Sequence, residues 1–124
     1  MYGNLNFNVL EGLVLSEIKQ IDNERLVFIT DKGREFSMFH DQDCCESVTI
    51  DDICGDLKDL IGSPILLAEE VSNEPIPPFE DDYIPESYTW TFYKISTFKG
   101  SVTIRWFGSS NGYYSESVNF EETT

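Results

Sequence analysis

The chain has 124 residues, with 23 Asp and Glu residues against eight Lys and Arg, and a formal net charge of −15 at pH 7. This length suits one compact domain, which we expect to span residues 1–124. A hydrophobic fraction of 40% with nine Phe, six Tyr and two Trp is enough for a core and excludes wholesale disorder. No apolar run approaches the roughly 20 residues of a membrane-spanning helix. We therefore expect a soluble intracellular protein without a membrane partner.

The negative charge is concentrated in the middle of the chain. Between Glu35 and Tyr93 there are 15 acidic residues and a single base, Lys58, whereas the rest of the chain is close to neutral. Such a field disfavours contact with DNA or RNA phosphates, so we predict no direct nucleic-acid binding. Two interpretations stay open: a solvated surface that keeps the protein soluble, or a surface that meets a basic partner.

The first third of the chain has the pattern of an antiparallel meander. Residues 9–40 contain three segments of apolar and β-branched residues, of which 25–30 (RLVFIT) is the clearest. They are separated by Asp22-Asn23 and by Asp31-Lys32-Gly33, which are typical of tight turns. This region is predicted to form three strands.

Residues 51–61 change from strand to helix periodicity. The apolar residues fall at i, i+4, i+7 and i+8, on one face of a helix: Ile53, Leu57, Leu60 and Ile61. Gly62 and Pro64 supply a stop signal, although Gly55 inside the segment costs roughly 1 kcal/mol relative to Ala. The spacing predicts one short helix here.

The second half reads as strands around one loop. Residues 65–68 begin a strand, and residues 73–86 hold four prolines and five acids, which predicts an exposed acidic loop. Three strongly β segments follow at 87–98, 101–107 and 113–120, and Asn111-Gly112 is a hairpin signal. We therefore expect a mainly β, or α+β, fold: a single curled antiparallel sheet of about six to seven strands with one short helix.

One histidine and the three cysteines form the densest group of possible metal ligands or nucleophiles: His40, Cys44, Cys45 and Cys54. An odd cysteine count in an intracellular chain argues against a disulfide framework, so Cys44 and Cys45 are expected to be free thiols. A structural zinc site usually draws on two separated ligand pairs, and acidic surroundings disfavour a reactive thiolate. We predict no enzyme activity, no catalytic residue, no metal and no cofactor. The alternative is a His/Cys metal or thiol site.

Aromatic and basic residues gather in the last third, in 88–94 and 105–115. One face of these strands could hold a planar ligand, with rings stacking on a base and cations contacting phosphate. The predicted ligand-binding residues are Trp90, Tyr93, Lys94, Arg105, Trp106, Ser109, Ser110, Asn111, Tyr113 and Tyr114. The alternative is a two-sided core in which Arg105 pairs with an acid.

Four segments of this chain resemble a widespread family of small, uncharacterised proteins of tailed bacteriophages. They are HDQDCCESV (40–48), DICGDL (52–57), ESYTWTFYK (86–94) and RWFGSSNGYYSE (105–116), and the likeness covers roughly residues 36–121. The family has no assigned activity. The resemblance implies a phage protein that acts in the host bacterial cytoplasm, where small non-enzymatic phage proteins often counter host defence.

From the aromatic cluster and this implied setting we expect a non-enzymatic phage protein that sequesters a small nucleotide-type ligand. A cyclic nucleotide or an ADP-ribose-like immune signal would be such a ligand. Because pockets of this kind often lie between identical subunits, we also expect a homo-oligomer. The alternative is an acidic inhibitor or DNA mimic that blocks a basic host protein.

Overall fold

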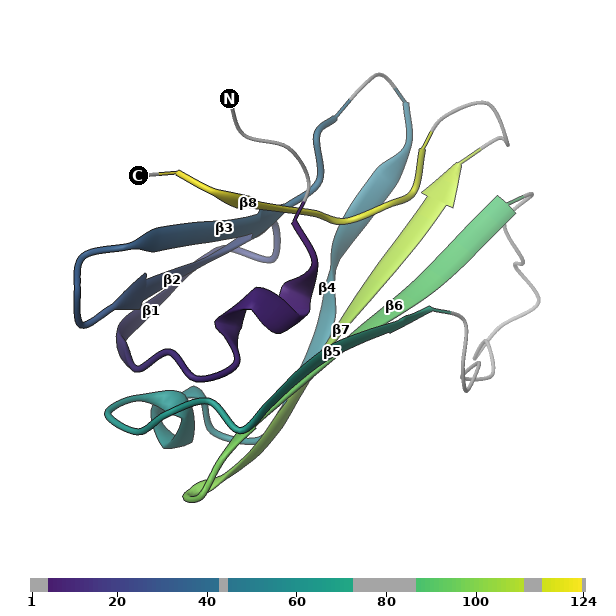
Figure 1. The fold of residues 1–124 in the computed structure, drawn as a ribbon. Helices are drawn as coiled ribbons and strands as arrows, with labels where there is room; N and C mark the ends of the chain where they lie inside the picture. Colours follow the sequence, from purple (N-terminus) through teal and green to yellow (C-terminus); the bar gives the residue numbers. More distant parts are fainter. Residues whose placement is uncertain (1–4, 43–44, 73–86, 111–114, 124) are drawn as a thin grey trace.

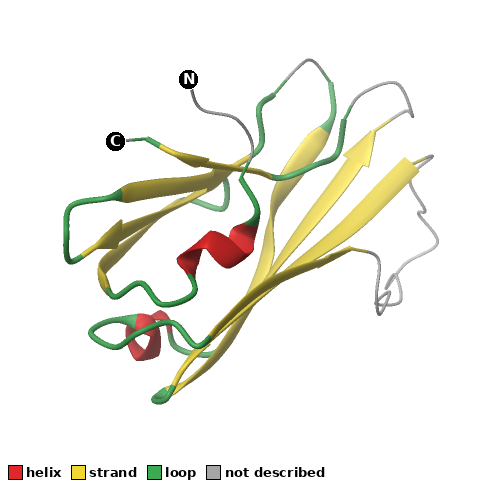
Figure 2. Cartoon of the chain, viewed as in Figure 1, coloured by secondary structure: helices red, strands yellow, loops and turns green. Residues whose placement is uncertain are grey.

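The protein folds into two antiparallel β-sheets of four strands each, as the computed structural model shows (Figure 1; Figure 2). The structure describes residues 5–42, 45–72, 87–110 and 115–123. The strands are β1 (Leu15–Ile21), β2 (Arg25–Thr30), β3 (Glu35–Phe39), β4 (Ser47–Cys54), β5 (Leu67–Ser72), β6 (Ser87–Thr97), β7 (Gly100–Ser110) and β8 (Asn119–Glu122), and two 3₁₀ helices are η1 (Phe7–Leu10) and η2 (Leu57–Leu60). Among the described residues, no helix is long and apolar enough to cross a membrane.

The first sheet has the strand order β1-β2-β3-β8. Its first three strands are consecutive antiparallel neighbours, which confirms the meander predicted over residues 9–40. At the β2–β3 turn the Thr30 amide donates to the Arg34 carbonyl at 2.8 Å, and Gly33 has a φ of +85°. Glycine adopts this left-handed conformation without a Cβ penalty. The last strand, β8, joins this sheet from the far end of the chain by pairing with β3.

The second sheet has the order β4-β7-β6-β5. Its centre is the long hairpin of β6 and β7, paired without a register break from Ser87↔Ser110 to Thr97↔Gly100. β5 and β4 are the two edge strands. Residues 87–98 and 101–107 are therefore strands as predicted, whereas β8 covers only the end of the segment predicted over 113–120.

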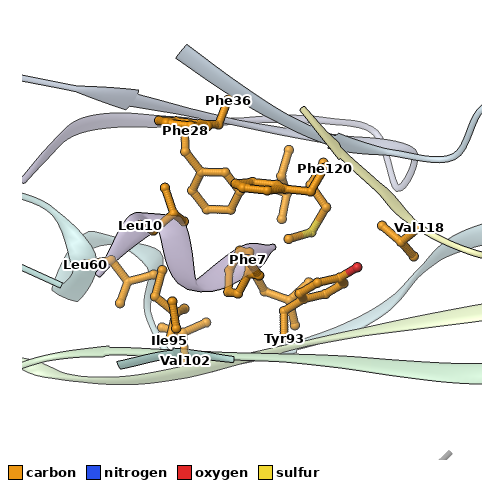
Figure 3. Packing of buried hydrophobic residues seen from close by; sticks show 14 of the residues in the cluster. Phe7, Leu10, Phe28, Phe36, Leu60, Tyr93, Ile95, Val102, Val118 and Phe120 are labelled. Atoms are coloured by element: carbon orange, nitrogen blue, oxygen red, sulfur yellow. The ribbon is translucent and has the colours of Figure 1, made fainter. Parts of the chain in front are cut away.

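One hydrophobic core lies between the two sheets, and η1 packs inside it (Figure 3). Phe7 of η1 contacts Tyr93 of the second sheet with ring centroids 4.8 Å apart and Phe120 of the first sheet at 5.2 Å. Edge-to-face aromatic pairs of this kind add about 1 kcal/mol beyond the area they bury. The amino-terminal segment therefore joins the two sheets through its aromatic ring.

The prediction of a single curled sheet of six to seven strands is wrong. Both sheets present apolar residues to the same core, and the chain crosses between them from β3 to β4 and from β7 to β8. An alternating sequence shows that a strand has one apolar face, but it does not show which strands share hydrogen bonds. Two sheets packed face to face bury both apolar faces, which a single open sheet cannot do.

The helix predicted over residues 51–61 is also wrong. β4 continues through Cys54, and only Leu57–Leu60 form a short 3₁₀ helix. Ile53 pairs with Ile104 in the sheet, and Leu60 is buried after the chain has turned. The helix-like spacing of the apolar residues therefore comes from the end of a strand followed by one 3₁₀ turn. Gly55 lies between them at a φ of +117°, which an α-helix does not allow.

Two further predictions fall outside the described residues. They are the acidic loop over 73–86 and the Asn111-Gly112 turn.

Candidate functional site

The pleat of β6 and β7 divides the predicted ligand-binding residues between two faces of the second sheet. Tyr93 and Trp106 are fully buried in the core, on the inner face that looks toward the first sheet. Trp90, Lys94 and Arg105 lie at alternate positions and therefore on the outer face. Those predicted residues that the structure describes therefore lie on both faces of the sheet and not in one site.

The inner pair serves the core. The Trp106 indole Nε1 donates to the Met38 sulfur at 3.1 Å, and Tyr93 packs against Phe7. With no exposed ring surface, neither residue can stack on a base. In this structure both side chains pack in the core, away from the surface of the molecule.

On the outer face Arg105 is already engaged. Its guanidinium forms an ion pair with the Asp51 carboxylate, in which Nε donates to Oδ2 at 2.8 Å, and its Cζ lies 5.1 Å from the Trp90 ring centroid. Phe107 packs on Trp90 with a centroid separation of 4.5 Å. Lys94 lies directly opposite Glu69 of β5. The pairing of Arg105 with an acid is the alternative that the sequence left open.

The remaining predicted residues lie near the end of β7. Ser109 pairs with Ser47 of β4 and Tyr88 of β6, and the Ser110 hydroxyl donates to the Glu116 Oε2 at 2.6 Å. Residues Asn111, Tyr113 and Tyr114 lie outside the described part of the chain.

His40 has a structural role that the sequence did not reveal. Its Nε2 lies 2.7 Å from the Glu46 Oε2 and its Nδ1 lies 2.7 Å from the Ser117 carbonyl oxygen, and the Glu46 side chain is fully buried. The Gln42 amide also donates to the Glu46 carbonyl. His40 therefore links the segment before β4 to the segment before β8. Several acidic residues follow His40 in the sequence, so the sequence alone could not show that Glu46 is its partner.

The cysteines do not join His40 in a metal site. Cys45 is disulfide-bonded, which corrects the expectation of a free thiol there. Cys54 is a free, exposed thiol at the end of β4, and Cys44 lies outside the described residues. Within the described ranges no cluster of three or more His, Cys, Asp or Glu side chains could hold a metal ion.

A polar cavity of about 320 Å³ opens between the sheets where β5 and β6 approach the segment before β8. We call it the Glu70 hollow. Carboxylates and hydroxyls dominate its lining, which consists of Glu70, Ser72, Thr89, Thr91, Ser115, Glu116, Ser117 and Val118. The Glu116 carboxylate accepts the Thr89 hydroxyl at 2.8 Å. No Lys or Arg is among the lining residues.

Glu70 and Tyr93 are direct cross-strand partners beside this hollow. The Tyr93 hydroxyl is buried beside the Glu70 carboxylate. Burial, the nearby Glu70 charge and a hydrogen bond with Glu70 all raise the pKa of Tyr93. Burial raises the pKa of the Glu70 carboxyl, and the Tyr93 hydrogen bond partly opposes this shift. The period-2 alternation of residues 67–72 would have placed Glu70 on the inner face beside Ala68, had the strand predicted over 65–68 been extended.

A second cavity, of about 530 Å³, lies between β5 and the segment around η1. Its lining is again rich in carboxylates and amides and holds no base: Asn6, Asn8, Glu11, Leu67, Ala68, Glu69 and Glu70. The described cavities along β5 are therefore acidic, in contrast to the cationic pocket that a phosphate requires.

These features define the class: an all-antiparallel two-sheet protein with acid-lined cavities between its sheets, in which nothing among the described residues points to an enzymatic activity. The chain belongs to the DUF7448 family, a domain of unknown function whose match covers residues 10–120. Neither a curated protein nor a solved structure matches the chain.

Proposed function

We propose that this protein is a non-enzymatic binding protein whose acidic surface captures a basic partner protein. One observation carries the proposal: the described cavities between the sheets are lined with carboxylates, while Arg105, the central cation of the last third, is neutralised by Asp51. The negative potential of these carboxylates attracts a basic surface and repels a phosphate group. In the phage setting implied by the sequence resemblance, the partner would be a host protein.

The distribution of charge supports the same proposal. Glu69 and Glu70 are exposed on β5, and Asp51 and Asp52 are exposed on β4, so both edges of the second sheet are acidic. Opposite charges across an interface raise the association rate and exclude wrong partners more than they raise affinity. The interaction should therefore be salt-sensitive, with exposed charges screened beyond about 10 Å at 0.1 M ionic strength.

A pull-down from bacterial lysate tests this proposal. The immobilised protein should retain a basic protein at about 50 mM NaCl and release it at about 500 mM. Replacing Glu69 and Glu70 by Lys should abolish retention. The matched control replaces Glu17 and Glu24 by Lys, which changes the net charge equally but lies outside the acidic stretch. Retention of no protein, or equal loss in both variants, would contradict the proposal.

A second candidate function is capture of a nucleotide on the outer face of the second sheet. The observation that favours it is the Arg105 guanidinium over the Trp90 ring, beside Phe107. A phosphate would have to displace Asp51 from Arg105 before it could bind. A thermal-shift screen of cyclic nucleotides and ADP-ribose derivatives distinguishes the two candidates. A ligand at 100 times its Kd adds about 2.7 kcal/mol of stability, and no shift from any nucleotide would remove this candidate. The homo-oligomer stays a prediction for sedimentation analysis.

A further inference from the structure

β1 is an edge strand of the first sheet, and most of its outer side is uncovered (Figure 1). Another segment bonds to the backbone of each of the other three edge strands: β4 at Ile50, β5 at Ala68 and β8 at Phe120. On β1 such contacts come from residues 61–65 and end at Leu15. Over residues 16–20, no backbone group bonds to a segment other than β2 within the part of the chain that the structure describes. These residues can therefore accept another strand.

The side chains of this edge carry one charge of each sign. Ser16, Glu17, Lys19 and Gln20 are exposed, whereas Ile18 is half-buried and packs against the core. Glu17 and Lys19 lie two residues apart, and both are on the outer face because Ile18 between them faces inward. Neither charge forms an ion pair among the described residues. Two opposite charges without partners thus lie beside an unpaired backbone edge.

The alternation of side chains restricts how two copies of β1 can pair about a two-fold axis. Directly opposite residues of an antiparallel pair point to the same face, so an axis perpendicular to the sheet must pass through a residue and not between two. An axis at Glu17 or at Lys19 would place two like charges opposite each other. An axis at Ile18 places Glu17 of each copy opposite Lys19 of the other. Only this register brings the opposite charges directly together.

We propose that β1 is a self-association surface, at which a second copy of this chain pairs antiparallel about Ile18. The two four-stranded sheets then form one continuous sheet of eight strands, and the unpaired backbone groups of residues 16–20 bond across the axis. Ile18 lies opposite its counterpart, which covers the part of this side chain that the core leaves exposed. Because the pairing uses β1 of both copies, the assembly closes as a dimer and does not grow into a fibre.

A bulge in β1 limits the strength of this interaction. Leu15 pairs with Thr30 and Glu17 with Ile29, so Ser16 is an extra residue, and the contacts at Leu15 cover the edge before it. Bulges and charged side chains commonly protect an edge strand from open-ended aggregation. Here they restrict pairing to five residues of each copy, a smaller interface than the roughly 1,200 Å² of stable complexes. We therefore expect a weak, reversible dimer.

Sedimentation velocity of the full chain between about 10 μM and about 1 mM tests the proposal. The wild type should shift reversibly from one chain to two as its concentration rises. Lys19→Glu should weaken this association at least about tenfold, because the two-fold axis converts both opposite-charge pairs into like-charge pairs. Glu17→Lys should weaken it equally for the same reason. A wild type that stays monomeric over the whole range would overturn the proposal.

Two rescue measurements test the register. The Lys19→Glu and Glu17→Lys variants, mixed in equal amounts, should associate, since every charge faces its opposite in the mixed dimer. The double variant Glu17→Lys with Lys19→Glu should regain the association of the wild type. If neither the mixture nor the double variant associates, β1 does not pair about Ile18. Because rescue requires folded chains, it also excludes misfolding as the cause of the single-variant losses.

Lys32→Glu is the matched control. It changes the net charge as Lys19→Glu does, but Lys32 is exposed in the turn between β2 and β3, so association should change about twofold at most. Equal weakening by both variants would show that net charge controls association, and would overturn the inference. The acidic strands β4 and β5 belong to the other sheet, so monomeric Lys19→Glu should still retain the basic partner protein. The dimer and the proposed function can therefore fail independently.

Discussion

Asp51 and Arg105 form an ion pair on the outer face of the second sheet, at the point where β4 is irregular. Ile50 pairs with Trp106 and Asp52 with Arg105, so Asp51 is an extra residue between two regular pairs. The extra residue leaves Asp51 and Asp52 both exposed and returns Ile53 to the inner face, where it pairs with Ile104 and packs against the core. On the outer face the Asp51 carboxylate accepts a hydrogen bond from the Arg105 guanidinium.

Loss of this pair should have a modest effect on stability. Arg105 and Asp51 keep 31% and 36% of their side-chain surface exposed, so solvent screens the attraction. A double-mutant cycle with Arg105→Ala and Asp51→Ala should give a coupling energy of about 1 kcal/mol by urea denaturation. A coupling above about 3 kcal/mol would instead indicate a fully desolvated pair.

The charge of Glu70 should destabilise the free protein at neutral pH. Its folded pKa is raised above the unfolded value of 4.5, so the stability that its protonated form contributes is present below that value and lost as pH rises through the folded pKa. Glu70→Gln should therefore raise the melting temperature at pH 7 and leave it nearly unchanged at about pH 4. A lower melting temperature at pH 7 would contradict the raised pKa of this carboxyl.

His40→Ala should lower the free energy of unfolding substantially. The change removes the imidazole beside the buried Glu46 carboxylate and the contact with the Ser117 carbonyl. Leaving a buried carboxylate without its hydrogen-bond partner costs about 1–3 kcal/mol or more. Asp41→Ala is the control, since the Asp41 side chain is exposed and only its backbone amide forms a bond, to Asn119. If both variants melt alike, His40 does not join the two segments.

Gly55→Ala tests the turn that replaced the predicted helix. A Cβ there would lie 2.6 Å from the Ser101 carbonyl oxygen, in addition to the strain of a φ of +117°. We expect a loss of about 3 kcal/mol or more, the sum of backbone strain and overpacking. Gly33→Ala also has a positive φ but meets no atom within 4 Å, so it should cost only about 1 kcal/mol. Equal losses would show that the contact with β7 does not matter.

The sequence by itself determined the elements whose signals are local. The meander of β1 to β3 and the hairpin of β6 and β7 join neighbours in the chain through short turns, and their alternation and turn residues specify the pairing. It also determined the acidic character of the middle of the chain, because charge needs no tertiary contact. The helix prediction over 51–61 was wrong because the spacing of its four apolar residues fits a strand end followed by a turn as well as it fits a helix.

Only the tertiary structure decided which strands share a sheet and which side chains meet across it. β8 pairs with β3 across about two thirds of the chain, and Glu70 meets Tyr93 because β5 adds to the edge of β6. The same alternation that makes β6 a strand separates Trp90 from Tyr93, but the sequence does not say which face the first sheet will cover. The core buries the face that packs against η1 and β8, and packing over such sequence distances leaves no local signal.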